Sequence, residues 1–481
     1  MEKIVSLAKR RGFIFQSSEI YGGLNGCWDY GPLGVEMLNN IKREWWKTMT
    51  FRDDVEGIDA SILMHPKVWE ASGHVANFSD PMVDCKNCKS RFRVDVLFDE
   101  LSVKKKKDIL REVFPNEFEG QQKDENISSE FAKRFELEEN QNKILKDFVP
   151  CPNCGNKNIF TDPRQFNLMF KTFVGPVEDV SNAVYLRPET AQGIFVNFLN
   201  VLNSSRQKLP FGIAQIGKAF RNEINTKNFL FRTREFEQME MQYFVKPGED
   251  DKYFDEWREE RFNWFIKLGM KSENLRWHKH EKLAHYAKGA FDIEFKFPFG
   301  WGEVEGIHNR TNFDLTQHEK YSGKSIKYFD ESTKEKITPF VIETSVGASR
   351  SFMAFLCASF NEEETKSADG SSETRTVLKL HEKIAPIKGA IFPLVNRDGM
   401  DVVAKNLYDN LKKSFKVFYD DSGAVGRRYR RQDEIGTPYC FTIDSDTLND
   451  ETVTVRERDS MKQERISISQ VKTFLSDKLS D

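Results

Sequence analysis

The stretch that most restricts the fold is 214–244, which has the pattern of two β-strands joined by a short polar loop. Alternate side chains of a strand point to opposite faces. One face of the first predicted strand therefore carries Gln215, Gly217, Ala219, Arg221 and Glu223, and one face of the second carries Phe236, Gln238, Glu240, Gln242 and Phe244. The opposite face of the hairpin is apolar. The pattern fits either an exposed hairpin with ordinary surface charge or the floor of a site for a charged, planar ligand.

The length and composition of the chain limit its class. A chain of 481 residues with 41 Phe and 8 Trp can form two or three domains with substantial cores. The net charge of −3 means that a nucleic-acid partner must be bound by local basic patches. No apolar run is long enough for a membrane span, and the first residues lack a signal-peptide core. We therefore expect a cytoplasmic protein with no membrane partner.

Four of the seven cysteines form two CxxC pairs, which are Cys85 with Cys88 and Cys151 with Cys154. Each pair can place two thiolates on one tetrahedral ion, so the four predict a structural Zn²⁺ site; reduced thiols without metal are the alternative. The Lys- and Glu-rich segment between them, Val96–Phe148, is predicted as a solvated helical insertion. A role in binding RNA phosphates is a secondary interpretation of this segment.

Helical character predicts helices at Met1–Arg11, Leu33–Met49 and Lys246–Lys282. A segment with strand character follows the second of them at Ile58–Met64. The helix Leu33–Met49 has an apolar stripe, which fits either the core of the chain or a dimer face. The stripe consists of Val35, Leu38, Ile41, Trp45 and Met49.

Two charged positions elsewhere indicate ligands. In the predicted strand Phe291–Asn312, simple alternation places Glu303 and Glu305 on one face. Adjacent carboxylates repel each other, so they suggest a site for Mg²⁺ or an ammonium group; a solvated strand edge is the alternative. Arg350 lies in the first turn of a helix that follows the strand Phe340–Gly347. A cation at that end opposes the helix dipole, so we expect an anion nearby.

From Gly389 onward, strands and helices alternate, which predicts a small α/β domain. Its predicted helix Gly423–Gln432 carries Arg427, Arg428, Arg430 and Arg431. These arginines fit either an ordinary solvated helix or a phosphate-binding face. Neither a GxxxxGK[ST] loop nor a GxGxxG loop after a strand is present.

Several segments in order resemble the class II aminoacyl-tRNA synthetases. The region Leu33–Pro66 resembles motif 1, Phe220–Glu223 with Arg232–Phe236 resembles motif 2, and Gly347–Arg350 resembles motif 3. More specifically, the chain resembles the homodimeric glycyl-tRNA synthetase family over almost its whole length. The segments that carry this are 28–32 (WDYGP), 71–75 (ASGHV), 187–193 (RPETAQG), 231–240 and 343–347 (ETSVG).

The resemblance implies an α+β fold with an antiparallel catalytic sheet flanked by helices, an inserted segment and a C-terminal α/β anticodon-binding domain. The expected boundaries are 1–84 for the N-terminal catalytic part, 85–160 for the insertion, 161–384 for the catalytic domain with motifs 2 and 3, and 385–481 for the anticodon-binding domain. It also implies a homodimer with motif 1 at its interface.

The resemblance further implies that the chain activates glycine with ATP and Mg²⁺ to glycyl-adenylate, and transfers glycine to the 3′ end of tRNA(Gly). Arg221 and Arg350 are the expected catalytic residues, with Arg221 at the α-phosphate. The expected ATP contacts are Arg221, Asn222, Glu223, Phe231, Arg232, Thr233, Arg234, Glu235, Phe236, Glu303, Val304, Gly347, Ala348, Ser349 and Arg350. The expected glycine contacts are Arg93, Glu189, Phe236, Glu237, Gln238, Met239, Glu240, Glu343, Thr344, Ser345, Val346 and Gly347.

Two alternatives stay open at this point. One is a synthetase of the same subclass for another amino acid, such as threonine or proline. The other is a non-catalytic nucleic-acid-binding relative. The acidic residues of the expected glycine pocket argue against the first, and the intact Arg221, Glu223 and Arg350 argue against the second.

Overall fold

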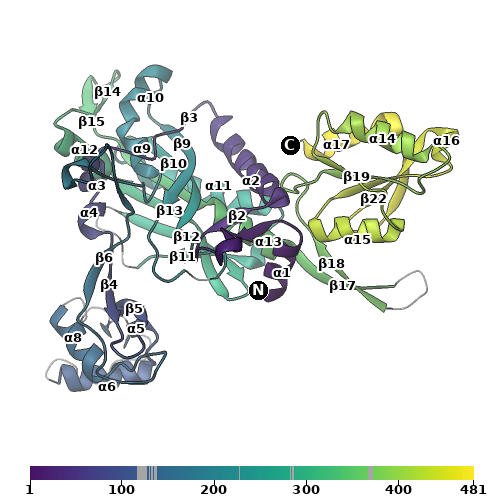
Figure 1. Cartoon of the computed structure of the whole chain (residues 1–481). Coiled ribbons are helices and arrows are strands. Elements are labelled where there is room, and N and C mark those ends of the chain that lie inside the picture. The colour runs from purple at the N-terminus through teal and green to yellow at the C-terminus, as the bar shows by residue number, and fades with distance from the viewer. Residues whose placement is uncertain are drawn as a thin grey trace. The chain divides into compact units, whose positions relative to one another are not determined.

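Strands β9 (Phe211–Phe220) and β10 (Glu235–Val245) form the antiparallel hairpin that the sequence predicts. The computed structural model describes residues 1–115, 127, 128, 130, 131, 134, 138–226, 228–281, 283, 287–366 and 372–480. Among them, the hairpin belongs to a seven-stranded sheet of order β11-β12-β13-β16-β10-β9-β3 (Figure 1). Only the edge strand β3 runs parallel to its neighbour. The other strands are β3 (Val55–Ile58), β11 (Leu275–Lys279), β12 (Gly289–Phe297), β13 (Gly300–Thr311) and β16 (Phe340–Gly347).

Three helices cover one face of this sheet. They are α2 (Pro32–Thr50), α11 (Asp250–Lys267) and α13 (Ala348–Ser359). Four residues of the apolar stripe of α2, from Leu38 to Met49, are buried in the core that these helices share with the sheet. Val35, the fifth, is 41% exposed. Most of the stripe therefore belongs to the core of the chain.

The opposite face is covered only at one end. There, α9 (Ala191–Val196), α10 (Phe198–Ser205) and α12 (Phe313–Ser322) contribute to a second core around Phe198, Phe211 and Phe244. The ring centroids of Phe198 and Phe244 are 4.6 Å apart. The rest of this face carries the polar residues of the hairpin.

The same unit contains shorter elements. Helix α1 (Glu2–Arg10) matches the helix predicted at Met1–Arg11, whereas α3 (Pro66–Ala71) was not predicted. Short 3₁₀ turns occur at Glu19–Tyr21 and Ser272–Asn274. The remaining strands are β1 (Ile14–Gln16), β2 (Trp28–Tyr30), β14 (Tyr328–Asp330), β15 (Glu335–Ile337), β17 (Phe360–Lys366) and β18 (Ser372–Leu378).

The expected common face for Glu303 and Glu305 is wrong. The pairing of β12 with β13 shifts its register at Ile293/Glu294, so that Ile293 lies opposite Glu305 and Glu294 opposite Glu303. This β-bulge leaves Val304 without a partner and breaks simple alternation. Glu305 consequently points to the helix-covered face, where it is buried against Arg261 of α11, while Glu303 stays on the open face.

Two predicted elements also differ. The strand expected at Ile58–Met64 is β3, which ends at Ile58, and the chain then continues without regular structure to α3. The helix expected over Lys246–Lys282 ends at Lys267, because Gly269 adopts a positive φ of 91°, and β11 follows. Lys282, the end of that prediction, lies outside the described residues.

Residues Gly73–Tyr185 form a separate unit, wider at both ends than the segment 85–160, because β4 (Ser79–Asp84) pairs with β6 (Arg164–Asn167). Its core packs Val94, Leu97 and Leu110 against both CxxC turns. The predicted helical character holds for α5, α6 and α8; part of Val96–Phe148 lies outside the described residues. The elements are α4 (His74–Asn77), β5 (Arg91–Arg93), α5 (Val94–Asp99), α6 (Val103–Val113), α8 (Glu138–Asp147), β7 (Lys171–Phe173), a 3₁₀ turn (Val180–Asn182) and β8 (Ala183–Tyr185).

The C-terminal part is the predicted α/β domain, with a mixed sheet of order β20-β19-β21-β22-β23 in the described residues. Helices α14 and α17 pack on one face and α15 on the other (Figure 1). The elements are β19 (Gly389–Pro393), α14 (Met400–Leu411), β20 (Val417–Tyr419), α15 (Val425–Ile435), β21 (Tyr439–Ile443), α16 (Thr447–Asp450), β22 (Thr452–Glu457), β23 (Gln463–Ser467), a 3₁₀ turn (Ile468–Gln470) and α17 (Val471–Leu479).

The arginines of α15 are mostly used within the chain. Arg428 is buried and donates to the carbonyl oxygens of Pro393, Asp420 and Gly423. Arg430 binds the hairpin β17–β18 through Glu373, and Arg431 pairs with Asp420. Three of the four are therefore structural rather than a free phosphate-binding face.

No helix in the described parts of the chain combines the length and the apolar character that crossing a membrane requires.

Candidate active site

The open face of the sheet carries its polar residues in rows that run across neighbouring strands. Directly opposite residues of antiparallel strands share a face and lie side by side. In one row, Gln215 of β9, Glu240 of β10, Ser345 of β16 and Gly306 of β13 are successive partners. In the next row, Gln242, Glu343 and His308 are successive partners on β10, β16 and β13. The strand register therefore gathers residues that are far apart in the sequence.

These rows form the floor of a cavity of about 240 Å³. Most of the predicted site residues line it. They are Glu189, Arg221, Glu223, Phe231, Arg232, Thr233, Phe236, Glu237, Gln238, Glu240, Glu303, Glu343, Ser345, Gly347, Ser349 and Arg350. The cavity joins β10, the segment after β9 and the start of α13 into one site, as the sequence suggests.

Glu343 is fully engaged by donors. One of its carboxylate oxygens accepts from Gln242 Nε2 at 2.8 Å and the other from His308 Nδ1 at 2.7 Å, and Arg310 Nη1 lies 3.1–3.2 Å from both. Burial opposes ionisation of Glu343, but Arg310 and His308 outweigh burial and lower its pKa to about 2. Glu343 is therefore a carboxylate whose charge is balanced before any ligand arrives.

Glu240 differs from Glu343 although the two are close. It is 2% exposed, and its side-chain partners are the hydroxyls of Thr190 and Ser345. Burial, with the charges of Glu343 and Glu189 nearby, raises the pKa of Glu240 to about 8. This end of the cavity is an acidic pocket that suits a small cation such as an ammonium group.

The other end of the cavity is cationic and aromatic. Arg350 pairs with Glu303 at 2.9 Å and lies over the ring of Phe231, 4.6 Å from its centroid. Burial opposes ionisation of Glu303, but the charge of Arg350 lowers its pKa. Arg221 follows β9 directly, donates to the carbonyl of Pro188 at 3.0 Å and lies 5.3 Å from the ring centroid of Phe236. Two arginines beside two rings suit a nucleotide, with its phosphates at the arginines.

Two glycines leave space for the polar side chains at the floor of the cavity. A Cβ at Gly306 would approach His308 Cε1 to 2.8 Å, and a Cβ at Gly217 would approach Arg187 Nη2 to 2.1 Å. A side chain at either position would displace a polar neighbour of the cavity. The sequence therefore needs glycine here for space rather than for a special backbone conformation.

The other predicted residues do not line the cavity. The side chains of Met239, Val304, Thr344, Val346 and Ala348 are buried, so only their backbone can contact a ligand. Arg234 supports the segment after β9, since its Nε donates to the carbonyl of Glu223 at 3.0 Å. Glu235 pairs with Lys218, and Asn222 is not one of the residues that line the cavity.

Arg93 belongs to the unit Gly73–Tyr185. Within that unit it pairs with Asp95 at 2.6 Å and with Asp80 at 3.0 Å. Its expected contact with the substrate stays a prediction.

Four residues that line the cavity were not predicted. They are Leu230, Gly306, His308 and Arg310. The signal was the spacing of the last three, which alternate on β13 and so share a face. The bulge at Val304 hid this signal, because alternation counted from Glu303 puts Glu305 on the cavity face instead.

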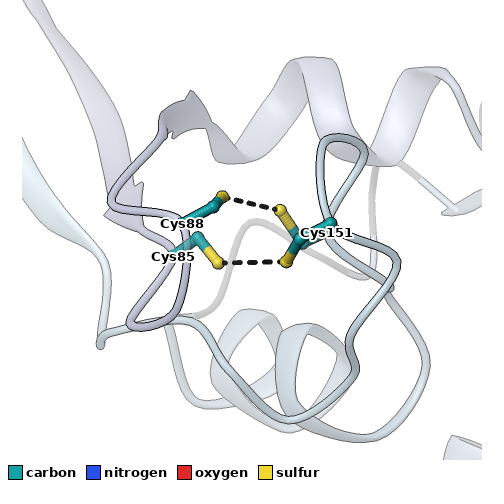
Figure 2. A group of neighbouring side chains, drawn as sticks. Cys85, Cys88 and Cys151 are labelled. Atoms are coloured by element: carbon teal, nitrogen blue, oxygen red, sulfur yellow. Dashed lines mark hydrogen bonds between the residues drawn. The ribbon is translucent and has the colours of Figure 1, made fainter.

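The four predicted metal-ligand cysteines come together in the unit Gly73–Tyr185. The sulfur atoms lie within 4.8 Å of one another, with 3.6 Å between those of Cys88 and Cys151 and 3.7 Å between those of Cys85 and Cys154. Figure 2 shows Cys85, Cys88 and Cys151 turned toward one another between two chain turns. With Zn–S bonds of about 2.3 Å, the edge of a tetrahedral site is about 3.8 Å, so this set fits a zinc ion.

Comparisons with known proteins agree with this arrangement. The family model for the tRNA synthetase class II core domain (G, H, P, S and T) matches residues 173–360. The models for glycyl-tRNA synthetase insertion domain 1 and for an anticodon binding domain match 80–168 and 388–478.

Curated relatives match over almost the full chain. Glycine–tRNA ligase of Treponema denticola is 53% identical over 481 residues, covering 98% of this chain and 96% of the relative. Those of Caldanaerobacter subterraneus and Streptomyces coelicolor are 54% and 49% identical over 482 and 485 residues, and each match covers 100% of this chain and 98% of the relative.

Proposed function

We propose, for a chain that belongs to the glycine–tRNA ligase family of class II aminoacyl-tRNA synthetases, that the cavity on the open face of the sheet is the site where glycine reacts with ATP. The chain is a ligase that joins glycine to tRNA, and class II synthetases use ATP and Mg²⁺. One observation carries the assignment of the site. A single cavity has buried carboxyls at one end and two arginines beside two aromatic rings at the other.

In this proposal, Arg221 binds the α-phosphate of ATP and stabilises the charge that develops there as the glycine carboxylate attacks. The carboxylate is already a nucleophile, so the reaction needs orientation and electrostatic stabilisation rather than a general base. Phe236 stacks on adenine, Glu223 and Asn222 contact it, and Arg232 binds the γ-phosphate. Arg350 closes over the nucleotide from the start of α13, which agrees with its contacts to Glu303 and Phe231. Thr233–Glu235 and Gly347–Ser349 complete the ATP contacts.

Glycine would bind at the acidic end, with its ammonium group at Glu240, Glu189 and Ser345, and Glu343 behind them. The backbone of β10 and β16 would form the walls, with Arg93 as a further proposed contact. Such a pocket would select glycine by excluding side chains, because each added carbon must displace a wall residue. Threonine and proline are larger than glycine, so the same geometry disfavours both.

Mg²⁺ would enter with ATP. Glu303 is an ionised carboxylate that lines the cavity, and it offers the hard oxygen ligand that Mg²⁺ prefers. The bulge removes Glu305 from this role, so the site has one acidic ligand from β13 rather than two.

Pyrophosphate exchange tests the assigned site. We expect exchange between pyrophosphate and ATP that depends on glycine and is not supported by threonine or proline. Arg221→Ala should lower exchange by about 10²–10³-fold, whereas Arg465→Ala, a change to an arginine of β23 in the C-terminal domain, should leave it unchanged. Full exchange activity in Arg221→Ala would refute the proposed role.

We also propose that the four cysteines bind a structural Zn²⁺. The purified protein should contain close to one zinc per chain by elemental analysis. Cys88→Ser should lose the metal, whereas Cys357→Ser, at a free cysteine of α13, should keep it. Absence of zinc from protein purified without chelators would refute the proposal.

The remaining partners follow from the family and are proposed here. The domain matched as anticodon-binding would bind tRNA(Gly), and two copies of the chain would form a homodimer. Phe51, which follows α2 and is 78% exposed, supports an interface there. Sedimentation velocity should give the mass of a dimer. The free cysteines agree with a reducing compartment such as the cytoplasm.

A further inference from the structure

Glu240 is a buried carboxyl without an ion-pair partner in the described part of the chain. Both hydroxyl partners, Thr190 and Ser345, are neutral, and no ion pair joins Glu240 to a cation in the described part of the chain. Arg187 comes from the same loop as Thr190, but its guanidinium donates to the carbonyls of Ala60 and Lys218, each at 2.7 Å. A buried carboxylate without a charge partner is unstable, so an empty pocket favours the protonated form.

The neighbours of Glu240 increase this preference. The acidic groups that face it are Glu343 on β16 and Glu189 in the loop before α9, and both repel a second negative charge. The nearby cations Arg310 and His308 on β13 are already bound to Glu343. Across β9, the partner of Glu240 is Gln215, which is neutral. Arg187 attracts Glu240 electrostatically but forms no ion pair with it, since its hydrogen bonds go to carbonyl oxygens. Burial and the charges of Glu343 and Glu189 outweigh this attraction and keep the pKa of Glu240 raised.

We propose that glycine enters this pocket by exchange for a proton. In the empty enzyme the Glu240 carboxyl carries the proton. When glycine binds, its ammonium group becomes the missing cation, the O–H bond of Glu240 breaks, and the proton leaves to solvent. The product is an ion pair between the Glu240 carboxylate and the ammonium group. The pair itself is neutral, and the complex as a whole, with the carboxylate of glycine, carries one more negative charge, which balances the proton lost to solvent. This inference rests on the proposed glycine site and adds its proton balance.

The exchange has a defined pH dependence. With the pKa of Glu240 raised to about 8 in the empty pocket, binding at pH 7 should release close to one proton. Below pH 8, each decrease of one pH unit should raise the Kd for glycine about tenfold, because protons compete with glycine for Glu240. Near pH 9 the release should fall toward zero, since the empty pocket is then already ionised.

Isothermal titration calorimetry with glycine, in buffers of different ionisation enthalpy at pH 7, measures the number of protons released. Equilibrium dialysis with labelled glycine measures binding independently of heat. Binding with about one proton released supports the exchange. Binding with no proton released overturns the exchange and leaves the glycine site standing. Absence of glycine binding in the dialysis would instead refute the proposed site itself.

Two variants assign the proton. Glu240→Gln should bind glycine more weakly and release no proton at pH 7. Glu303→Gln makes the same chemical change in the same cavity and should keep the release, since Glu303 is already ionised. If Glu240→Gln no longer binds, difference infrared spectroscopy of the wild-type enzyme decides the matter. A protonated-carboxyl band that disappears on glycine addition supports the proposal, and its absence from the empty enzyme at pH 7 overturns it.

Discussion

The ion pair between Arg261 and Glu305 gives the sharpest test of how the sheet is arranged. Both side chains have no exposed surface, and two hydrogen bonds of 2.7 and 3.3 Å join the guanidinium to the carboxylate. Arg261 cannot release its proton to escape burial. Glu305→Gln therefore leaves a buried, unpaired cation, and we expect a loss of about 3–5 kcal/mol in the free energy of unfolding.

Replacing both partners should cost much less. In Arg261→Met with Glu305→Leu, two apolar side chains occupy the space of the pair, and such replacements are often neutral or stabilising. Urea unfolding, followed by tryptophan fluorescence, measures both variants. Trp264 reports locally, since its ring centroid lies 4.8 Å from the Arg261 guanidinium. A double variant as unstable as the sum of the two single variants would refute the reasoning.

The same double variant tests the direction of Glu305. Because this side chain faces α11 rather than the cavity, the folded double variant should keep the wild-type KM values for glycine and ATP in pyrophosphate exchange. A large increase in the KM for ATP, with folding intact, would mean that Glu305 acts beside Glu303 after all.

Three further outcomes follow from the structure. Arg221→Ala should lower the rate of glycine activation about 10²–10³-fold with unchanged circular dichroism, because it removes one electrostatic contact to the transition state; Arg221→Lys should recover only part of the rate. Gly34→Ala should lower stability by at least about 1–3 kcal/mol in urea unfolding, because its Cβ would lie 1.8 Å from the carbonyl oxygen of Phe13. Gly426→Ala in α15, where nothing lies within 4 Å, is the matched control and should be neutral or stabilising. In the empty enzyme, burial raises the pKa of Glu240 to about 8, whereas in the unfolded state this carboxyl releases its proton near pH 4.5. The free energy of unfolding should therefore fall as the pH rises from about 4.5 to 8. Glu240→Gln should reduce that fall in thermal unfolding, and an identical pH profile would contradict it.

Local patterns predicted the elements whose geometry is itself local. The alternation of Gln215 and Gly217 on β9 and of Gln238 and Glu240 on β10 needs only the strand period, and the pairing places these residues on one face. Arg350 at the start of a helix indicated an anion, and Glu303 is its partner. Such features depend on neighbours within a few residues.

The features that the sequence predicted wrongly, left open or did not indicate depend on contacts between distant segments. The bulge at Val304 arises from the pairing of β12 with β13, and no residue near Val304 in the sequence indicates it. The arginines of α15 have the composition of a phosphate-binding face, yet Arg428 is buried by loops on either side of it. The part that His308 and Arg310 play in the site follows from their hydrogen bonds to Glu343, which lies 33 or more positions away in the chain.

The cysteine cluster has a consequence for how this chain tolerates change in length. The sulfurs of Cys88 and Cys151 meet although the residues are 63 positions apart. The entropy of closing such a loop grows only with the logarithm of its length, so doubling the loop costs about 0.6 kcal/mol. A reporter domain or an affinity tag should therefore be tolerated between the two CxxC turns, at surface positions outside the core residues Val94, Leu97 and Leu110, while the two CxxC turns hold the ends of the stretch together.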